Sequence, residues 1–206
     1  MIAVLDVALG SVRCEPASRL DCESDNEHLF HHRALDQDSR QICRPPSESN
    51  VDLVVDVRFM PRSRTNPQFN LETLPEGLAP WRIGYKHMAE LGGLRGKQRL
   101  AEPSPNAYWR GRSFRNYADY ALTEPFASGL AQLRERGSQH RCTIMCAEAV
   151  WWRCHRRIIT DYLLAAGEQV MHILGTSQVE EARLTPGAVL RHDGTVVYPA
   201  ESPRPG

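Results

Sequence analysis

Residues 142–167 read CTIMCAEAVWWRCHRRIITDYLLAAG, and this stretch decides the fold. Its first four residues, CTIM, are typical of a short buried strand. Residues 158–167, IITDYLLAAG, are typical of a helix that ends on a glycine cap at Gly167. The polar residues between them therefore lie after the carboxyl end of a strand and before a helix. Open α/β sheets bind their ligands at that place.

The same alternation of strand and helix begins at Val51. VDLVVDVR is an almost continuous apolar, β-branched run, as expected of a central strand covered on both faces. Further strands are predicted at IGYKHM (83–88) and QVMHIL (169–174). We therefore expect an α/β fold, a single domain with a mostly parallel sheet flanked by helices.

Turn-forming residues mark the ends of the remaining elements. A short helix is predicted at residues 71–78 and ends before Pro80, and a longer helix at about 114–136 is split by Pro125. Near the end of the chain, VLRHDGTVVYP places Asp193-Gly194 between two β-prone runs, which predicts a C-terminal β-hairpin.

Composition and charge exclude several classes of protein. The chain has 206 residues, 41% hydrophobic and 24% charged, with a net charge of zero, as is ordinary for one globular domain. Residues 1–50 hold nine acidic and five basic side chains, so the rest of the chain is only mildly basic. We expect neither a membrane span nor strong nucleic-acid binding.

The cysteines and the first residues of the chain bear on its location. Three of the six cysteines, Cys142, Cys146 and Cys154, lie close together beside histidine and arginine, in a chain too large to need disulfides. The apolar start, IAVLDVALG, has no basic region before it and does not fit a secretory signal. A reduced, cytoplasmic protein is expected.

The chain divides into three regions that differ in their sequence pattern. Residues 1–50 form an irregular extension that ends in the linker-like RPPSESN, and only IAVLDVAL within it fits a strand. Residues 51–200 carry the α/β pattern, and residues 201–206 form a short tail.

Five motifs carry a resemblance to a known family. DVRFMPRSRTNPQFN, HMAELGG, FRNYADYAL, MCAEAVWWRCHRR and HIL follow one another in the order found in the DUF488 family of uncharacterised bacterial and archaeal proteins. The resemblance covers about residues 51–199. It implies a single cytoplasmic α/β domain of a prokaryote and brings no established reaction.

Residues 1–50 depart from that family. Its members usually open with a strand bearing a T-[IV]-G-H-[ST] motif and then a helix, and neither is found here. Either the extension replaces this first βα unit, or the start of the chain is aberrant. In both cases the sheet is expected to lack a strand, and the site a Gly-His contribution.

Three side chains of the 146–155 loop are candidates for catalysis: Cys146, Glu148 and His155. Cys146 fits a thiolate nucleophile at a strand end, with an arginine and a helix start to lower its pKa. Against this, six residues separate it from Arg153, where phosphate-cradling loops have five, and the loop has no glycine. The alternative is a buried structural cysteine.

We expect no metal site. Cys146, Cys154 and His155, with His172, offer zinc ligands, but their spacing fits no common zinc module. If Cys154 and His155 both begin a helix, their side chains point about 100° apart, which hinders joint ligation.

Several residues at the strand ends are candidates for ligand binding. Arginine suits phosphate or carboxylate, and we expect Asp56 and Glu148 each to orient one arginine and leave another for a ligand. The loop with Asn66 and Phe69 is expected to form a lid over the strand ends, and Gly92-Gly93 is expected to let the backbone approach a ligand closely. The alternative is turn chemistry alone. The candidates are Asp56, Arg58, Asn66, Phe69, Gly92, Gly93, Arg153 and Arg156.

The sequence thus predicts an enzyme-like domain that binds a small anionic ligand, a nucleotide or another phosphate-bearing molecule, and catalyses hydrolysis or group transfer. A non-catalytic binding module, either an effector sensor or a nucleic-acid-associated protein, is the alternative. The sequence indicates neither a cofactor nor an oligomeric state.

Overall fold

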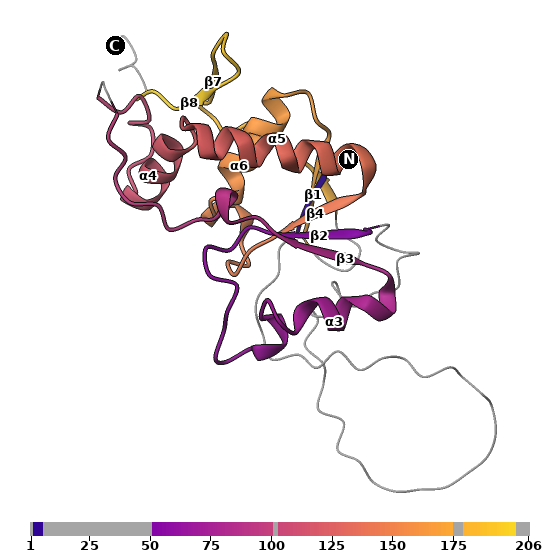
Figure 1. Ribbon diagram of the computed structural model, residues 1–206. Helices are drawn as coiled ribbons and strands as arrows, with labels where there is room; N and C mark the ends of the chain where they lie inside the picture. Colours follow the sequence, from indigo (N-terminus) through magenta and orange to yellow (C-terminus); the bar gives the residue numbers. More distant parts are fainter. Residues whose placement is uncertain (1, 6–50, 101–102, 175–178, 201–206) are drawn as a thin grey trace, which may run out of the picture.

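The computed structural model describes residues 2–5, 51–100, 103–174 and 179–200 (Figure 1). Six strands form one sheet in the order β3-β2-β4-β1-β5-β6. β1 (Ile2–Leu5), β2 (Leu53–Asp56), β3 (Gly84–His87), β4 (Cys142–Met145) and β5 (Val170–Ile173) run parallel. Only β6 (Val179–Glu181) is antiparallel to its neighbour. The predicted α/β fold with a mostly parallel sheet is confirmed.

The first strand corrects the expectation that the sheet would lack one. β1 lies between β4 and β5 and pairs with both, with Ile2 opposite Cys142 on one side and Val170 on the other. The run IAVL was recognisable as a strand by its apolar, β-branched residues. Its position could not be inferred, because a parallel partner can lie at any distance along the sequence. The rest of the first 50 residues lies outside the described part.

Helices cover both faces of the sheet (Figure 1). On one face lie α4 (Arg112–Tyr120), α5 (Glu124–Gln139) and α6 (Arg156–Ala165), whose apolar residues pack with Val55, Ile144 and Cys146. On the other face, α3 (Leu74–Leu78) packs with Val54 and Met145. Alternate residues of β2 and β4 thus enter two separate cores, as the period of a strand requires.

The helix ends follow the local chemistry with small differences from prediction. The helical region after residue 111 is split as predicted, with Pro125 in the first turn of α5, where its missing N–H costs nothing. α3 ends at Leu78 as predicted, but Pro80 lies inside a 3₁₀ turn (Ala79–Trp81) that continues it. α6 is followed by Gly167 at φ 80°, the predicted left-handed cap.

The predicted C-terminal hairpin is confirmed. β7 (Val189–Leu190) and β8 (Val196–Val197) pair antiparallel around Gly194, whose φ of 82° suits a tight turn. The Asp193 carboxylate accepts hydrogen bonds from the N–H and hydroxyl of Thr195, which fixes the turn. Residues beyond the hairpin return to the core, where Tyr198 is fully buried.

Candidate functional site

The carboxyl ends of β2 and β4 place a thiol and imidazole cluster beside the start of α6. Cys146 directly follows β4, and Cys154 and His155 precede α6, after a 3₁₀ turn (Trp151–Arg153). The two Sγ atoms and the His155 Nδ1 all lie within 4.8 Å of one another. We call Cys146, Cys154 and His155 the thiol–imidazole cluster.

The convergence of Cys154 and His155 differs from the divergence expected of helix neighbours. Cys154 has an extended backbone, φ −115° and ψ 152°, and α6 begins only at Arg156. The rotation of 100° per residue therefore does not apply to this pair. Instead, Nδ1 of His155 lies 3.5 Å from Sγ of Cys154 and 4.0 Å from Sγ of Cys146.

The imidazole of His155 is oriented by the main chain of β2. Its Nε2 lies 3.1 Å from the carbonyl oxygen of Val57, which can only accept, so Nε2 carries the proton. Nδ1 is then left with a lone pair that faces the two sulfurs. Tyr117 of α4 packs against the ring at 4.8 Å between centroids and donates its hydroxyl to the carbonyl oxygen of Leu91.

Arg156 is fully buried and holds the loop that carries Cys146. Its Nη2 donates to the carbonyl oxygens of Glu148 and Ala149, and its Nε donates to Sγ of Cys154 at 3.4 Å. The guanidinium thus closes the 146–154 loop and supplies positive charge to one sulfur. This is an internal structural role, whereas the sequence had predicted a contact with ligand.

The two thiols share protons unequally. The pKa of Cys154 is lowered, first by a hydrogen bond from the Cys146 thiol and then by His155 and Arg156. The pKa of Cys146 is raised by the same interaction and by burial. The hydrogen bonds that Cys154 accepts, including one from Nε of Arg156, therefore favour its thiolate form over that of Cys146.

The remaining strand-end acid and base form a buried ion pair. Asp56 and Arg58 are both buried, Nη2 of Arg58 lies 2.5 Å from Oδ2 of Asp56, and the same Nη2 donates to the carbonyl oxygen of Phe69. Tyr85 donates its hydroxyl to Asp56 at 2.6 Å, and burial together with this bond raises the pKa of Tyr85. The pairing expected of Asp56 is present, and it ties β2 to β3 and to the 59–70 loop.

Other predicted binding residues are distributed around the cluster or away from it. Gly93 lies against His155, and its neighbour Gly92 lies against the backbone of Phe59. Asn66 is buried, and Phe69 lies in the α3-side core, on the sheet face opposite Cys146.

Two charged residues of the 146–155 loop are exposed. Glu148 accepts a hydrogen bond from the N–H of Val150, and its carboxylate pairs with no arginine of the described ranges. Arg153 forms no ion pair with any residue that the structure describes. Arg153 is thus the guanidinium of this loop that faces solvent.

Sequence reasoning missed two contributors to the cluster. The carbonyl of Val57 orients His155, but a main-chain atom leaves no signal in the sequence. Tyr117 belongs to the quoted motif FRNYADYAL, and that motif was the available signal for it.

His172, proposed above as a fourth ligand, instead stacks on Trp151 with 3.7 Å between ring centroids. Burial and the charge of Arg156 lower the pKa of His172 to about 4.

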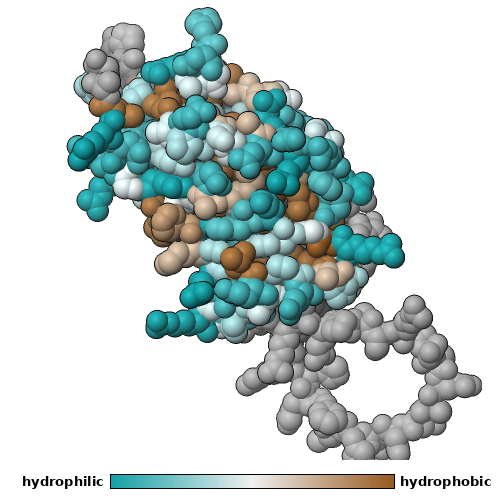
Figure 2. Space-filling view, viewed as in Figure 1, coloured by the Kyte–Doolittle hydropathy of each residue, from teal (hydrophilic) through white to brown (hydrophobic). Residues whose placement is uncertain are grey.

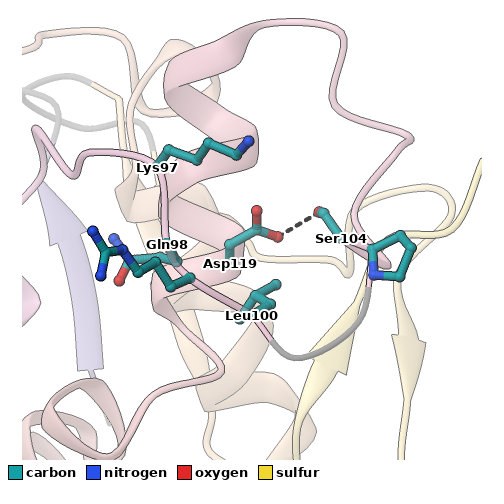
Figure 3. A pocket seen from close by; sticks show the side chains of 7 residues that line it. Lys97, Gln98, Leu100, Ser104 and Asp119 are labelled. Carbon is teal, nitrogen blue, oxygen red and sulfur yellow. Dashed lines mark hydrogen bonds between the residues drawn. The ribbon is translucent and has the colours of Figure 1, made fainter.

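A separate depression lies beside α4 (Figure 3). It has a volume of about 670 Å³ and is lined by Lys97, Gln98, Arg99, Leu100, Pro103, Ser104 and Asp119. Its carboxylate, Asp119, already accepts hydrogen bonds from Ser104 at 2.5 Å and from Asn106 at 2.8 Å. It contains none of the predicted site residues.

The surface around these features is mostly polar. On the face shown in Figure 2, hydrophobic side chains occur in small scattered groups. Within the described ranges, no helix is both long and apolar enough to cross a membrane.

Of the comparisons with known proteins, the one with family models gave a match. No curated protein and no solved structure matched the chain. A family described as a domain of unknown function, DUF488, matches residues 38–163, which begins upstream of the first quoted motif and ends within α6. That stretch includes the whole thiol–imidazole cluster, and the chain belongs to the DUF488 family.

Proposed function

We propose that the chain is an enzyme that binds a small, phosphate-bearing ligand above the thiol–imidazole cluster and catalyses hydrolysis or group transfer. The observation that carries the proposal is the convergence of two thiols on one imidazole nitrogen whose opposite N–H is bound to Val57. A core cysteine needs no oriented imidazole, whereas general acid–base and nucleophilic chemistry both depend on one.

The surroundings of the cluster support a ligand that is anionic at one end. Arg153 is exposed on the same loop, and guanidinium is a forked donor suited to phosphate. The start of α6 contributes less than the sequence predicts, because the N–H groups of Arg157 and Ile158 already bond to Cys154 and His155. Recognition of the anion therefore rests mainly on the Arg153 side chain.

Apolar side chains on the neighbouring loops support a ring at the other end of the ligand. Phe59, Leu94 and Trp152 are 47%, 82% and 50% exposed. Phe59 lies two residues after Val57, and Leu94 and Trp152 directly follow Gly93 and Trp151. Val57 and Gly93 both contact His155, so the loops that carry these side chains meet at the cluster. Exposed aromatic rings stack readily on nucleobases, which favours a nucleotide as the ligand.

A thermal-shift screen against nucleotides, sugar phosphates and inorganic phosphate tests binding. We expect a nucleotide to raise the melting temperature, and Arg153→Ala to abolish the rise, while Arg110→Ala, another exposed arginine, leaves it intact. In a turnover assay with the ligand so found, Cys146→Ser and His155→Asn should lose at least about a hundredfold in rate and still bind. A cooperatively melting protein that no phosphate compound stabilises would exclude the proposal.

A further inference from the structure

The thiol–imidazole cluster has the donor set and the spacing of a metal site. In a tetrahedral zinc site, bonds of about 2.3 Å to sulfur and about 2.0 Å to nitrogen put these two ligand atoms about 3.6 Å apart. Nδ1 of His155 lies 3.5 Å from Sγ of Cys154 and 4.0 Å from Sγ of Cys146. We propose that Cys146, Cys154 and His155 bind one Zn²⁺ ion, against the absence of a metal expected from the sequence.

The orientation of His155 suits a ligand. Nε2 donates its proton to the carbonyl oxygen of Val57, so the lone pair of Nδ1 faces the sulfurs. Histidines that bind metals usually donate their second N–H to a carbonyl or a carboxylate in this manner. For a nucleophile, one thiol beside the imidazole would suffice. A metal ion accounts for all three donors.

Arg156 holds the two cysteines in position for an ion. It ties the carbonyls of Glu148 and Ala149 to the start of α6, and its Nε–H donates to Sγ of Cys154. Such a bond to a sulfur ligand stabilises the thiolate form that a metal requires. Two thiolates, a neutral imidazole and Zn²⁺ carry no net charge together, so the buried guanidinium meets no repulsion.

Gly93 packs directly against the imidazole that supplies the nitrogen donor. A Cβ at position 93 would stand 2.8 Å from Nδ1 of His155 and 3.1 Å from its Cε1. Any residue other than glycine would press on the face of the imidazole and displace its Nδ1 from the two sulfurs. The backbone of the 92–93 turn thus forms one wall of the site.

Sulfur and imidazole donors together are characteristic of zinc. Among the described residues the group has three members, as in catalytic zinc sites, which leave a fourth position for water. The reaction that the ion would support rests on the proposed function. Thiolates bound to zinc are no longer free nucleophiles, which favours hydrolysis over group transfer. The bound water gives its hydroxyl to one product and its proton to the other.

Metal content of the full chain tests the binding. After chelation and reloading with Zn²⁺, we expect one ion per chain by elemental analysis, and loss of that ion in Cys146→Ser, Cys154→Ser and His155→Gln. Cys142→Ser is the matched control, since Cys142 is a buried thiol at the start of β4 and outside the cluster, and it should retain the ion. A triple serine variant at Cys14, Cys22 and Cys43 should also retain it. Zinc kept by the Cys146 or Cys154 variants would overturn the proposal.

Spectroscopy on the wild-type protein avoids dependence on variants that fail to fold. Zinc-edge X-ray absorption should show two sulfur neighbours at about 2.3 Å and at least one nitrogen. A shell of nitrogen and oxygen alone would overturn the metal site. The thermal shift by nucleotides, measured with and without zinc, separates the two proposals. A zinc-loaded protein that binds no phosphate compound refutes only the proposed function. Nucleotide binding by a chain that takes up no zinc refutes only the metal site.

Discussion

Gly93 and His155 are in such close contact that a Cβ atom at position 93 would stand 2.8 Å from the imidazole Nδ1. Gly93→Ala should therefore displace the imidazole or the 92–93 turn, lower the free energy of unfolding by about 1–3 kcal/mol, and weaken zinc binding. Urea unfolding and metal titration measure the two effects.

Gly96→Ala is the matched control, because nothing lies within 4 Å of a Cβ at that position. It should change the free energy of unfolding by no more than about 0.5 kcal/mol. Equal stability and equal zinc affinity in both variants would contradict the close contact.

The buried ion pair of Asp56 and Arg58 should be essential for stability. Asp56→Asn leaves the buried guanidinium without its counter-charge and should lower the free energy of unfolding by about 3–5 kcal/mol. Tyr85→Phe removes only one hydrogen bond to Asp56 and should cost about 1 kcal/mol. Glu72→Gln breaks the exposed pair with Arg62 and should have almost no effect, and a comparable loss there would argue against this account.

Two helical glycines should respond to alanine in opposite directions. In α5, a Cβ at Gly129 would stand 2.8 Å from Cβ of Glu90, so Gly129→Ala should destabilise the protein despite the better helix propensity of alanine. In α3, nothing lies within 4 Å of a Cβ at Gly77, and Gly77→Ala should stabilise by about 0.5–1 kcal/mol. Thermal unfolding of both variants checks the difference in sign.

His172 should make the protein sensitive to mild acid. Its pKa falls from 6.5 to about 4 on folding. Between these two pH values the imidazole is protonated in the unfolded chain and neutral in the folded chain. Stability should fall between pH 6.5 and 4, with a slope of at most about 1.4 kcal/mol per pH unit. His172→Leu should flatten this slope, and the exposed His192→Gln should not. An unchanged slope in His172→Leu would assign the acid sensitivity to other groups.

The strands were predictable because their signals are local. VDLVVDVR and CTIM are apolar along their length, as strands buried on both faces must be, and Asp193-Gly194 specifies its own turn. The placement of β1 was not predictable, because pairing between distant segments depends on the whole sheet and leaves no mark in a four-residue run.

The convergence of the candidate residues was predictable from the sequence, and the geometry among them was less so. Strand direction brought Cys146 and His155 to one edge, as expected, but the sequence does not reveal that Cys154 is extended. Nor does it reveal which arginine is engaged internally. Arg156 turned inward to the loop carbonyls, whereas Arg153, three residues earlier, stays in solvent.

The position of β1 has a consequence for the order of folding. In the described sheet, β1 (Ile2–Leu5) lies between β4 and β5, so it joins the strands β3-β2-β4 to the strands β5-β6. Strands β3, β2 and β4 can assemble as one unit, whereas β5 and β6 join this unit only when β1 has paired with both β4 and β5. Closing so long a loop costs entropy before any contact repays it, so insertion of β1 should be a late, slow step. During synthesis on the ribosome, β1 emerges long before its partners, and it can pair with β4 only after Cys142–Met145 has emerged and with β5 only after Val170–Ile173 has followed.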